Sequence, residues 1–166
     1  AFGGLSILVN CAGTVAPGNA EDTTVETWDD QMAVHARGAF LGIKHAIPEM
    51  RKAGGGSIVN VSSISGLVGG SGGVAYPAAK GASRLLSRAT AIQYAEQGIR
   101  VNSVHPGYTE TPLANVSIQM LTKAGVSADY RVTKVPMGRQ GRAIEIARGI
   151  LFLASDEARH ISGHNL

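Results

Sequence analysis

Short apolar runs that alternate with long helical stretches constrain the fold of this chain more than any other feature. The apolar runs cover residues 5–9, 57–62 and 99–104, and each ends in polar or glycine residues. Between them, apolar residues recur with a helical period over 24–52 and 74–97. Strands that alternate with helices of this length are typical of βαβ units, and continuous apolar strands are expected where helices cover both faces of a sheet. The pattern therefore predicts an α/β fold built on a parallel sheet.

Composition limits the class of protein further. The 166 residues are 44% hydrophobic and 16% charged, which is typical of a globular domain with a buried core. The net charge is +3, but lysine and arginine are scattered, so no nucleic-acid partner is expected. The chain contains one cysteine, no secretory signal and no apolar run long enough to span a membrane. We therefore expect one cytoplasmic domain over residues 1–166, without a membrane partner.

The histidines do not suggest a metal site. His45, His105, His160 and His164 lack the spacing of metal ligands in the sequence. We expect no bound metal, and we expect these rings on the surface or beside the site.

Tyr76 and Lys80 form the sharpest chemical signal in the sequence. Four residues apart on a helix, the two side chains share one face, and Pro77 between them requires the helix to begin nearby. The ordinary pKa of tyrosine, ~10, is too high for acid–base chemistry at neutral pH, and a neighbouring ammonium lowers it. We therefore expect Lys80 to tune Tyr76 as the proton donor or acceptor that carbonyl reduction needs. Ser63 is placed to bind the reacting oxygen through its hydroxyl.

Polar residues follow each predicted strand at the same edge of the sheet. Residues 10–13, Ser62 with Ser63, and residues 106–111 come directly after the three apolar runs. In open parallel sheets, ligands bind in the crevice outside the carboxyl ends of the strands. We therefore expect these three segments to meet at one site.

Several motifs, in the same order along the chain, resemble those of short-chain dehydrogenase/reductases. Asn-Cys-Ala-Gly after the first strand resembles the family's Asn-Asn-Ala-Gly motif, and Ser63 stands thirteen positions before Tyr76, which is the family's usual spacing. The resemblance covers essentially the whole chain. The matching segments are 10–13, 56–63, Tyr76 with Lys80, 100–111 and 136–155.

The resemblance implies a role for each matched residue. Tyr76 is expected to be the general acid/base, Ser63 to orient the substrate carbonyl, and Lys80 to lower the pKa of Tyr76 and bind the nicotinamide ribose. The cofactor, NAD or NADP, is expected to supply the hydride. The residues expected to bind the cofactor are Asn10, Cys11, Ala12, Gly13, Tyr76, Lys80, Pro106, Gly107, Thr109 and Thr111.

The function that the resemblance implies is the interconversion of a secondary alcohol and a ketone. Its partner is then a small alcohol or ketone. A homo-oligomer, dimer or tetramer, is also expected, because the helices at 27–52 and 74–97 carry apolar residues on more than one face. The identity of the substrate stays open, since its pocket depends on the stretch 112–135, which is predicted as irregular helix and loop.

Two segments typical of the family are absent from the 166 residues. One is the opening βαβ unit with its Thr-Gly-x-x-x-Gly-x-Gly turn, which holds the cofactor's pyrophosphate at a helix N-terminus, and the other is a C-terminal Val-Asp-Gly-Gly strand. Because the chain opens on Ala1 and stops soon after Gly163, we expect a fragment. The resemblance therefore implies a doubly wound, Rossmann-like sheet, a single partial dinucleotide-binding and catalytic domain that lacks the first βαβ units. Without the missing turn, the choice between NAD and NADP stays open.

His35 stands where the family carries a catalytic asparagine. The family segment is Asn-Leu-x-Gly-x-Phe, and the aligned run here is His-Ala-Arg-Gly-Ala-Phe. In the family the asparagine holds a water that links the lysine to solvent, and a histidine ring nitrogen can also hold a water. The ordinary pKa of histidine, ~6.5, predicts proton exchange at neutral pH and a loss of activity below that pH. The other interpretations are a tolerated substitution and a protein that no longer turns over.

Two other functions stay open on the sequence. The missing phosphate-binding turn favours a non-catalytic fragment of such an enzyme, unable to hold cofactor alone. A Gly-x-Ser-x-Gly pattern over residues 69–73 suggests a serine hydrolase, with Ser71 as nucleophile and Asp156 and His160 downstream. A nucleophile elbow needs a strand immediately before it, which this run lacks, so the hydrolase is the weakest of the three.

Overall fold

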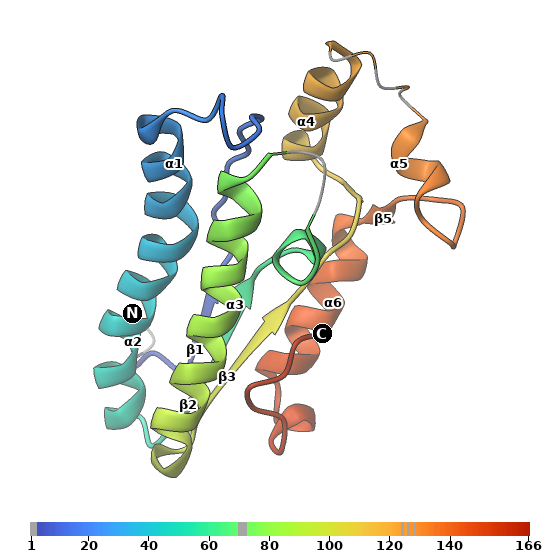
Figure 1. Cartoon of the computed structure of the whole chain (residues 1–166). Helices are drawn as coiled ribbons and strands as arrows, with labels where there is room; N and C mark the ends of the chain where they lie inside the picture. The colour runs from blue at the N-terminus through green and yellow to red at the C-terminus, as the bar shows by residue number, and fades with distance from the viewer. Residues whose placement is uncertain (1–2, 70–72, 124, 126, 128) are drawn as a thin grey trace.

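Three parallel strands form the centre of the molecule in the order β1-β2-β3 (Figure 1). They are β1 (Ile7–Asn10), β2 (Gly56–Val61) and β3 (Ile99–Val104). The three predicted strands and their parallel pairing are therefore confirmed. The structure is a computed structural model, and it describes residues 3–69, 73–123, 125, 127 and 129–166.

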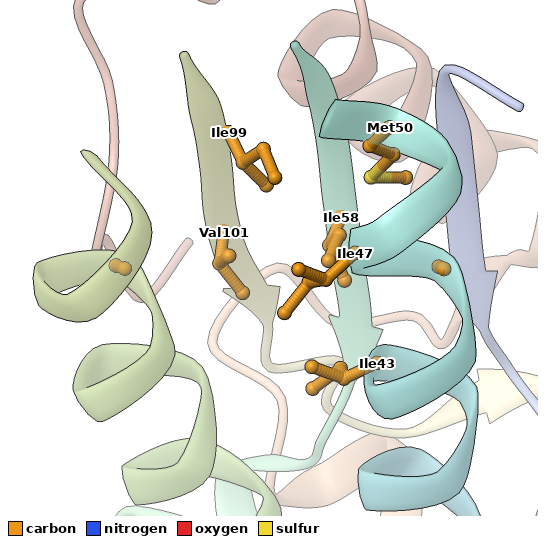
Figure 2. Packing of buried hydrophobic residues seen from close by; sticks show 8 residues of the cluster. Ile43, Ile47, Met50, Ile58, Ile99 and Val101 are labelled. Carbon is orange, nitrogen blue, oxygen red and sulfur yellow. The ribbon is translucent and has the colours of Figure 1, made fainter. Parts of the chain in front are cut away.

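One face of the sheet is covered by two long helices. They are α2 (Gly38–Lys52) and α3 (Ala75–Tyr94), which run side by side along the strands (Figure 1). Figure 2 shows the apolar side chains of α2 between this helix and the strands β2 and β3. Each fully buried aliphatic side chain contributes roughly 1.5–3 kcal/mol to folding. The buried cluster on this face consists of Ile43, Ala46, Ile47, Met50, Ile58, Ala91, Ile99 and Val101.

The opposite face is covered by α6 (Ala143–Ala154). Leu153 of this helix is fully buried against Val59 and Val104, whose side chains point away from α2 and α3 because neighbouring residues of a strand alternate between its faces. Helices on both faces of a parallel sheet make the doubly wound, Rossmann-like arrangement that the sequence predicted.

The single helix predicted over 24–52 is interrupted. Helix α1 (Val25–Met32) leads into a π-helical turn, η1 (Ala33–Arg37), before α2 continues. A π-turn inserts one extra residue into an α-helix and is frequent at functional sites. Here the turn carries His35, whose side chain is buried. The helix ends before Gly54, whose φ of 85° favours a residue without a side chain.

The helix predicted over 74–97 forms with nearly the predicted bounds. It carries Pro77 in its first turn, where the N–H groups have no intrahelical partner and proline is tolerated. It is closed by Gly98, whose φ of 69° is left-handed, as expected for a glycine after a helix. Tyr76 and Lys80 therefore lie in the first two turns of α3.

The region after β3 contains short elements. Where the sequence predicted irregular helix and loop, helix α4 (Pro112–Lys123) has 12 residues and α5 (Tyr130–Thr133) is a single turn. The two-residue strands β4 (Thr109–Glu110) and β5 (Gly141–Arg142) pair in parallel as a separate small sheet. The remaining short turns are η2 (Ile64–Gly66), η3 (Ala95–Gln97) and η4 (Asp156–Ala158).

Residues 163–166 run along the outer edge of β3. The Leu166 amide donates to the Ser103 carbonyl over 2.9 Å, and the His105 amide donates to the Leu166 carbonyl over 2.7 Å. Asn165 forms a parallel bridge with Ser103. These residues pair with β3 through this isolated bridge and are not a further strand of the sheet.

The other side of the sheet ends in β1, which pairs only with β2 within the described residues. Leu5, Ile7 and Val9 are 37%, 48% and 39% exposed. These side chains give the sheet an exposed apolar edge at β1. Exposed edges of this kind present free N–H and C=O groups to other chains.

We expect Ile7→Lys to weaken self-association of the 166-residue chain, because a charged side chain on an exposed edge opposes the addition of another strand. The expected change is at least about fivefold in the association constant, which corresponds to about 1 kcal/mol. Light scattering over a concentration series measures it. The control is Met137→Lys, which adds the same charge at an exposed loop position. Equal association of wild type and Ile7→Lys would show that the β1 edge is not the contact.

No helix in the described part of the chain is long and apolar enough to cross a membrane. Among the same residues, no three His, Cys, Asp or Glu side chains gather as metal ligands would.

Candidate active site

The carboxyl ends of the three strands meet at one edge of the sheet, as the sequence predicted. The Ile64 amide, just after β2, donates to the Pro106 carbonyl, just after β3, over 3.1 Å. On the other side of β2, the side-chain Nδ2 of Asn10, at the end of β1, donates to Oδ1 of Asn60 over 2.7 Å. These bonds join the three expected segments into one surface.

Ser63, Tyr76 and Lys80 lie together at this edge. Ser63 follows β2, while Tyr76 and Lys80 come from the start of α3. The Ser63 side chain lies near enough to the Tyr76 phenol to lower its pKa as a hydrogen-bond partner, and Nζ of Lys80 lies 5.7 Å from the centroid of the Tyr76 ring. The structure therefore brings together the three side chains that the sequence singled out from two separate segments.

Lys80 is buried although it carries an amine. The residue is 5% exposed, and its Nζ donates to the Val61 carbonyl over 2.8 Å. Burial lowers the pKa of Lys80 to about 8, because the ammonium loses its hydration, while the nearby Cys11 acts in the opposite direction. The amine therefore loses its positive charge at a pH that is only slightly above neutral.

The pKa of Tyr76 is raised above its ordinary value, which contradicts the expectation from spacing. Burial of the phenol penalises the tyrosinate and is the largest effect, while the hydrogen bond with Ser63 acts in the opposite direction. Lys80 does not lower the value, because its own pKa of about 8 lies below that of the phenol, so the amine has lost its charge before Tyr76 ionises. In this arrangement Tyr76 is held as a protonated phenol.

His35 lies beside Tyr76 with the two rings edge to face. The ring centroids are 5.2 Å apart, and the planes make an angle of 86°. Nε2 of His35 lies 2.9 Å from the Thr14 carbonyl oxygen, which only accepts, so Nε2 carries the proton. Nδ1 is then an acceptor, and it is buried without a partner among the described residues. The structure therefore brings His35 to the predicted site with one acceptor unused.

The pKa of His35 is lowered to about 4, first by burial and then by the charge of Lys80. The ring is 3% exposed, so water does not stabilise the imidazolium. The predicted proton exchange near pH 6.5 is therefore wrong, because the ring is neutral throughout that range. A break in activity caused by His35 is expected near its own pKa instead.

The burial of His35 should appear as pH-dependent stability. Its folded pKa of about 4 lies below the unfolded value of ~6.5, so the contribution is fully present above the unfolded pKa and is lost as the pH falls toward the folded one. The loss is at most about 3 kcal/mol. Urea unfolding at about pH 7 and about pH 4.5 should show a larger loss for wild type than for His35→Asn. The control, His160→Asn at an exposed position, should behave as wild type; equal losses in wild type and His35→Asn would contradict the prediction.

A cavity of about 200 Å³ opens beside these side chains. Its polar lining comes from the end of β1, from η1 and from α3. Next to it, a Cβ on Gly13 would lie 3.0 Å from Cε1 of His35, so this position favours glycine. The residues that line the cavity include Asn10, Cys11, Ala12, His35, Lys80 and Ser83. The cavity therefore lies between the first residues of the Asn-Cys-Ala-Gly motif and the predicted catalytic lysine.

The segment expected to hold the nicotinamide carboxamide lies on the next loop, outside the lining of this cavity. The Thr109 hydroxyl donates to the Gly107 carbonyl over 3.1 Å. The Thr111 hydroxyl accepts from the Ala114 amide over 3.2 Å and so caps the start of α4. Both hydroxyls are engaged locally, and their role toward a cofactor stays a prediction.

Sequence reasoning missed a buried polar chain behind the site. The Asn60 amide donates to the Ser87 hydroxyl over 2.8 Å, and that hydroxyl donates to the Ser83 carbonyl over 2.8 Å. Together with the bond from Asn10, the chain links the end of β1 to α3. An amide in the middle of an apolar strand was the available signal, because a buried polar group needs partners.

Ser71, the nucleophile of the hydrolase alternative, lies outside the described residues. Its suggested partners Asp156 and His160 are exposed residues that follow α6. The hydrolase therefore stays a prediction to which the described residues add nothing.

A doubly wound parallel sheet with serine, tyrosine and lysine gathered at its carboxyl edge defines a class of Rossmann-like α/β proteins. The family model described as enoyl-(acyl carrier protein) reductase matches residues 1–166. The chain belongs to the short-chain dehydrogenase/reductase family.

The chain is similar to curated relatives over nearly its whole length. The 2,5-dichloro-2,5-cyclohexadiene-1,4-diol dehydrogenase LinX of Sphingobium indicum is 44% identical over 167 residues, which is 100% of this chain and 64% of LinX. Cyclopentanol dehydrogenase of Comamonas testosteroni is 44% identical over 162 residues, 98% of this chain and 63% of that protein. The chain therefore spans less than two thirds of the length of these relatives.

Solved structures match the fold closely. Levodione reductase superposes with a TM-score of 0.95 at 32% identity, over 99% of this chain and 65% of that chain. ElxO, whose structure contains NADP, superposes with a TM-score of 0.89 at 31% identity, over 99% of this chain and 66% of that chain. These matches confirm the Rossmann-like fold class.

Proposed function

We propose that this chain supplies the catalytic site of an enzyme that interconverts a secondary alcohol and a ketone with a nicotinamide cofactor, NAD or NADP. The observation that carries the proposal is the meeting of Ser63, Tyr76 and Lys80 at the carboxyl edge of the sheet. The relatives named for cyclopentanol and for a cyclohexadiene diol support a hydroxyl on a small ring as the substrate group. The NADP in ElxO supports the class of cofactor.

The residues around the cavity fit parts of such a cofactor: by resemblance, Lys80 would bind the nicotinamide ribose and Asn10–Gly13 would line the adenosine side. The Lys80 amine is a donor for ribose hydroxyls, and the segment Asn10–Gly13 exposes backbone, since Gly13 has no side chain to block the approach. By resemblance, Pro106, Gly107, Thr109 and Thr111 would hold the carboxamide. When bound, the cofactor supplies or accepts the hydride.

The catalytic side chains act on one oxygen of the substrate. During reduction the Tyr76 phenol gives its proton to the carbonyl oxygen, and the raised pKa keeps this proton in place until it is needed. The Ser63 hydroxyl, which lies beside the phenol, orients the same oxygen. Lys80 stabilises the tyrosinate that forms, and its pKa of about 8 leaves it charged at neutral pH.

His35 serves in this scheme as a hydrogen-bond acceptor. Because its pKa is about 4 and its Nε2–H is directed to the Thr14 carbonyl, the ring accepts through Nδ1 without taking up a proton at neutral pH. It can therefore hold a water beside Lys80, but the proton passes through that water and not through the ring.

A substrate screen tests the proposal. The enzyme to assay is the 166-residue chain and the product of any longer reading frame that contains it. We expect oxidation of cyclopentanol and cyclohexanol with NAD or NADP, and no cleavage of a chromogenic ester. Absence of turnover with every secondary alcohol and both cofactors would overturn the proposal.

The non-catalytic alternative is supported by the bare β1 edge and by the absence of a glycine-rich phosphate turn from these residues. It leads us to expect that the 166-residue chain alone binds NAD(H) and NADP(H) very weakly. Calorimetric titration measures this, and micromolar binding by a soluble monomer would exclude the alternative.

Assembly into a homo-oligomer is part of the proposal. Phe40, Leu85 and Ile92 are 47%, 63% and 81% exposed on α2 and α3. A second copy of the chain would remove this apolar surface from water. A stable monomer by light scattering would argue against it.

A further inference from the structure

His105 joins the segment that carries Ser63 to β3. Its Nδ1 lies 3.0 Å from the Ser63 carbonyl oxygen, and its Nε2 lies 2.9 Å from Oγ of Ser103. That hydroxyl is in turn 2.9 Å from Oδ1 of Asn165, in the segment beside β3. His105 is 8% exposed and Ser103 is fully buried. The imidazole is therefore a buried side-chain link between the Ser63 backbone and the sheet.

The partners of the ring decide which nitrogen carries the proton. A carbonyl oxygen only accepts, so Nδ1 donates to Ser63. Burial lowers the pKa of His105, so the ring is neutral at pH 7 and Nε2 accepts the single proton of the Ser103 hydroxyl. The Ser103 hydroxyl lies within bonding distance of two acceptors, Nε2 of His105 and Oδ1 of Asn165; with the oxygen and nitrogen of the Asn165 amide exchanged, Asn165 would donate to the Ser103 oxygen instead.

The Ser63 carbonyl is held from two sides. It accepts from the Gly66 amide over 2.9 Å as well as from His105, and the backbone of Ser63 is extended, with φ −165° and ψ 158°. The hydroxyl of the same residue accepts from the Ser65 amide over 3.1 Å. Fixing the carbonyl limits rotation of the peptide plane, and this fixes the direction in which the hydroxyl meets Tyr76.

We propose that His105 is a positioning residue, which fixes the Ser63 carbonyl through its Nδ1–H and so aims the serine hydroxyl at the reacting oxygen. The kinetic consequence of this inference rests on the proposed function, whereas the structural consequence does not. Catalytic groups displaced by about 1 Å lose rates of up to ~10²-fold, so a single buried bond to the backbone is enough to matter.

The first test needs no activity. In the 15N-labelled chain at pH 7, two-bond correlations in NMR should show His105 as the neutral Nδ1–H tautomer. The Nε2–H tautomer, or a protonated ring, would overturn the proposal.

The second test compares two amides in place of the ring. In His105→Asn the Nδ2–H group replaces the Nδ1–H donor to Ser63, whereas in His105→Gln the amide reaches toward Ser103 and leaves the Ser63 carbonyl without this bond. We expect kcat to fall by about tenfold or more in the Gln variant with KM within about threefold, and the Asn variant to keep kcat within about threefold. Equal loss in both variants, or full activity of the Gln variant, would overturn the proposal.

A double-mutant cycle separates positioning from general stability. In a Ser63→Ala background, His105→Gln should cause no further loss of kcat, whereas additive losses would show that the ring acts independently of the serine. If no form of the protein turns over a secondary alcohol, the proposed function has failed. The NMR measurement of the His105 tautomer still tests the proposed bond to the Ser63 carbonyl, because it needs no activity. The same measurement decides if the Gln variant does not fold.

Discussion

Replacing Tyr76 with phenylalanine is expected to lower kcat/KM for a secondary alcohol by roughly 10²–10⁴-fold, the usual loss when a general acid or base is removed. The variant keeps the aromatic ring and so its contact with His35, 5.2 Å between centroids, but it loses the hydroxyl that faces Ser63. Because the Tyr76 side chain is only partly buried, the free energy of unfolding should change by no more than about 1–2 kcal/mol. Steady-state kinetics together with urea unfolding measure the two effects separately.

The matched control is Tyr94→Phe. Tyr94 is the last residue of the same helix. Its side chain packs against the buried apolar cluster between the sheet and the helices α2 and α3, away from Ser63. We expect kcat/KM of this variant to stay within about twofold of wild type, as for most changes remote from a site. Near-full activity of Tyr76→Phe would remove the central claim about the reaction.

The second large effect is expected from Lys80→Met, which should raise the stability of the fold and lower the activity. Burial of Lys80 lowers its pKa to about 8, so at pH 7 the fold holds a poorly hydrated ammonium that costs up to about 3 kcal/mol. Methionine of similar length removes this cost but also the bond to the Val61 carbonyl, which is worth about 1 kcal/mol. We therefore expect a net gain in the free energy of unfolding of about 1–2 kcal/mol. The rate should fall by at least about 10²-fold, because the charge that stabilises the tyrosinate is lost.

The pH dependence identifies the cause of that gain. The folded pKa of Lys80 lies below its unfolded value of ~10.5, so its contribution is complete above the unfolded pKa and is lost as the pH falls through about 8. The advantage of Lys80→Met in urea unfolding should therefore shrink as the pH is raised from about 7 to about 10. Lys44→Met, at an exposed position, is the control and should show no such trend. A constant advantage would mean that burial of the charge is not its origin.

The sheet and its two layers of helices were predictable because local signals agreed with the tertiary structure. The apolar run at 57–62 is buried on both faces as β2. Successive side chains of this strand point to opposite faces, so Ile58 packs on the side of α2 and α3 and Val59 packs on the side of α6. Glycine at residue 98 and proline at residue 77 marked the ends of α3 through backbone geometry alone. Such signals depend only on residues close in the sequence.

The π-helical turn at Ala33–Arg37 was not predictable from periodicity. The apolar positions on its two sides follow the same helical period, so a continuous helix was the simplest interpretation. The extra residue in the turn is decided by contacts distant in sequence, such as the one between His35 and the Thr14 carbonyl. Sequence reasoning identified His35 by its position in a motif, but not the neutral state that burial imposes.

Spacing pointed to Tyr76 and Lys80 as a proposed catalytic pair only in combination with other motifs. Tyr130 and Lys134 have the same separation, and their amine lies 5.4 Å from the ring centroid, close to the 5.7 Å of Tyr76 and Lys80. Lys134, however, is exposed, whereas Lys80 is buried beside the Ser63 segment. The direction of the pKa shifts of Tyr76 and Lys80 depends on their burial, which no local pattern contains.

The polar chain from Asn10 through Asn60 to Ser87 has a consequence for how the strands find their alignment. Apolar faces alone tolerate several alignments of a parallel pair, but a slip of one residue would turn Asn60 to the other face of the sheet. Its amide would then lose both partners, at a cost of about 1–3 kcal/mol for each unsatisfied group. Misaligned sheets are thereby penalised while they form. Asn60 therefore favours one alignment of the strands over the others. In variants such as Asn60→Val, we expect a larger fraction of chains to fold with misaligned strands, before any chemistry at the site is disturbed.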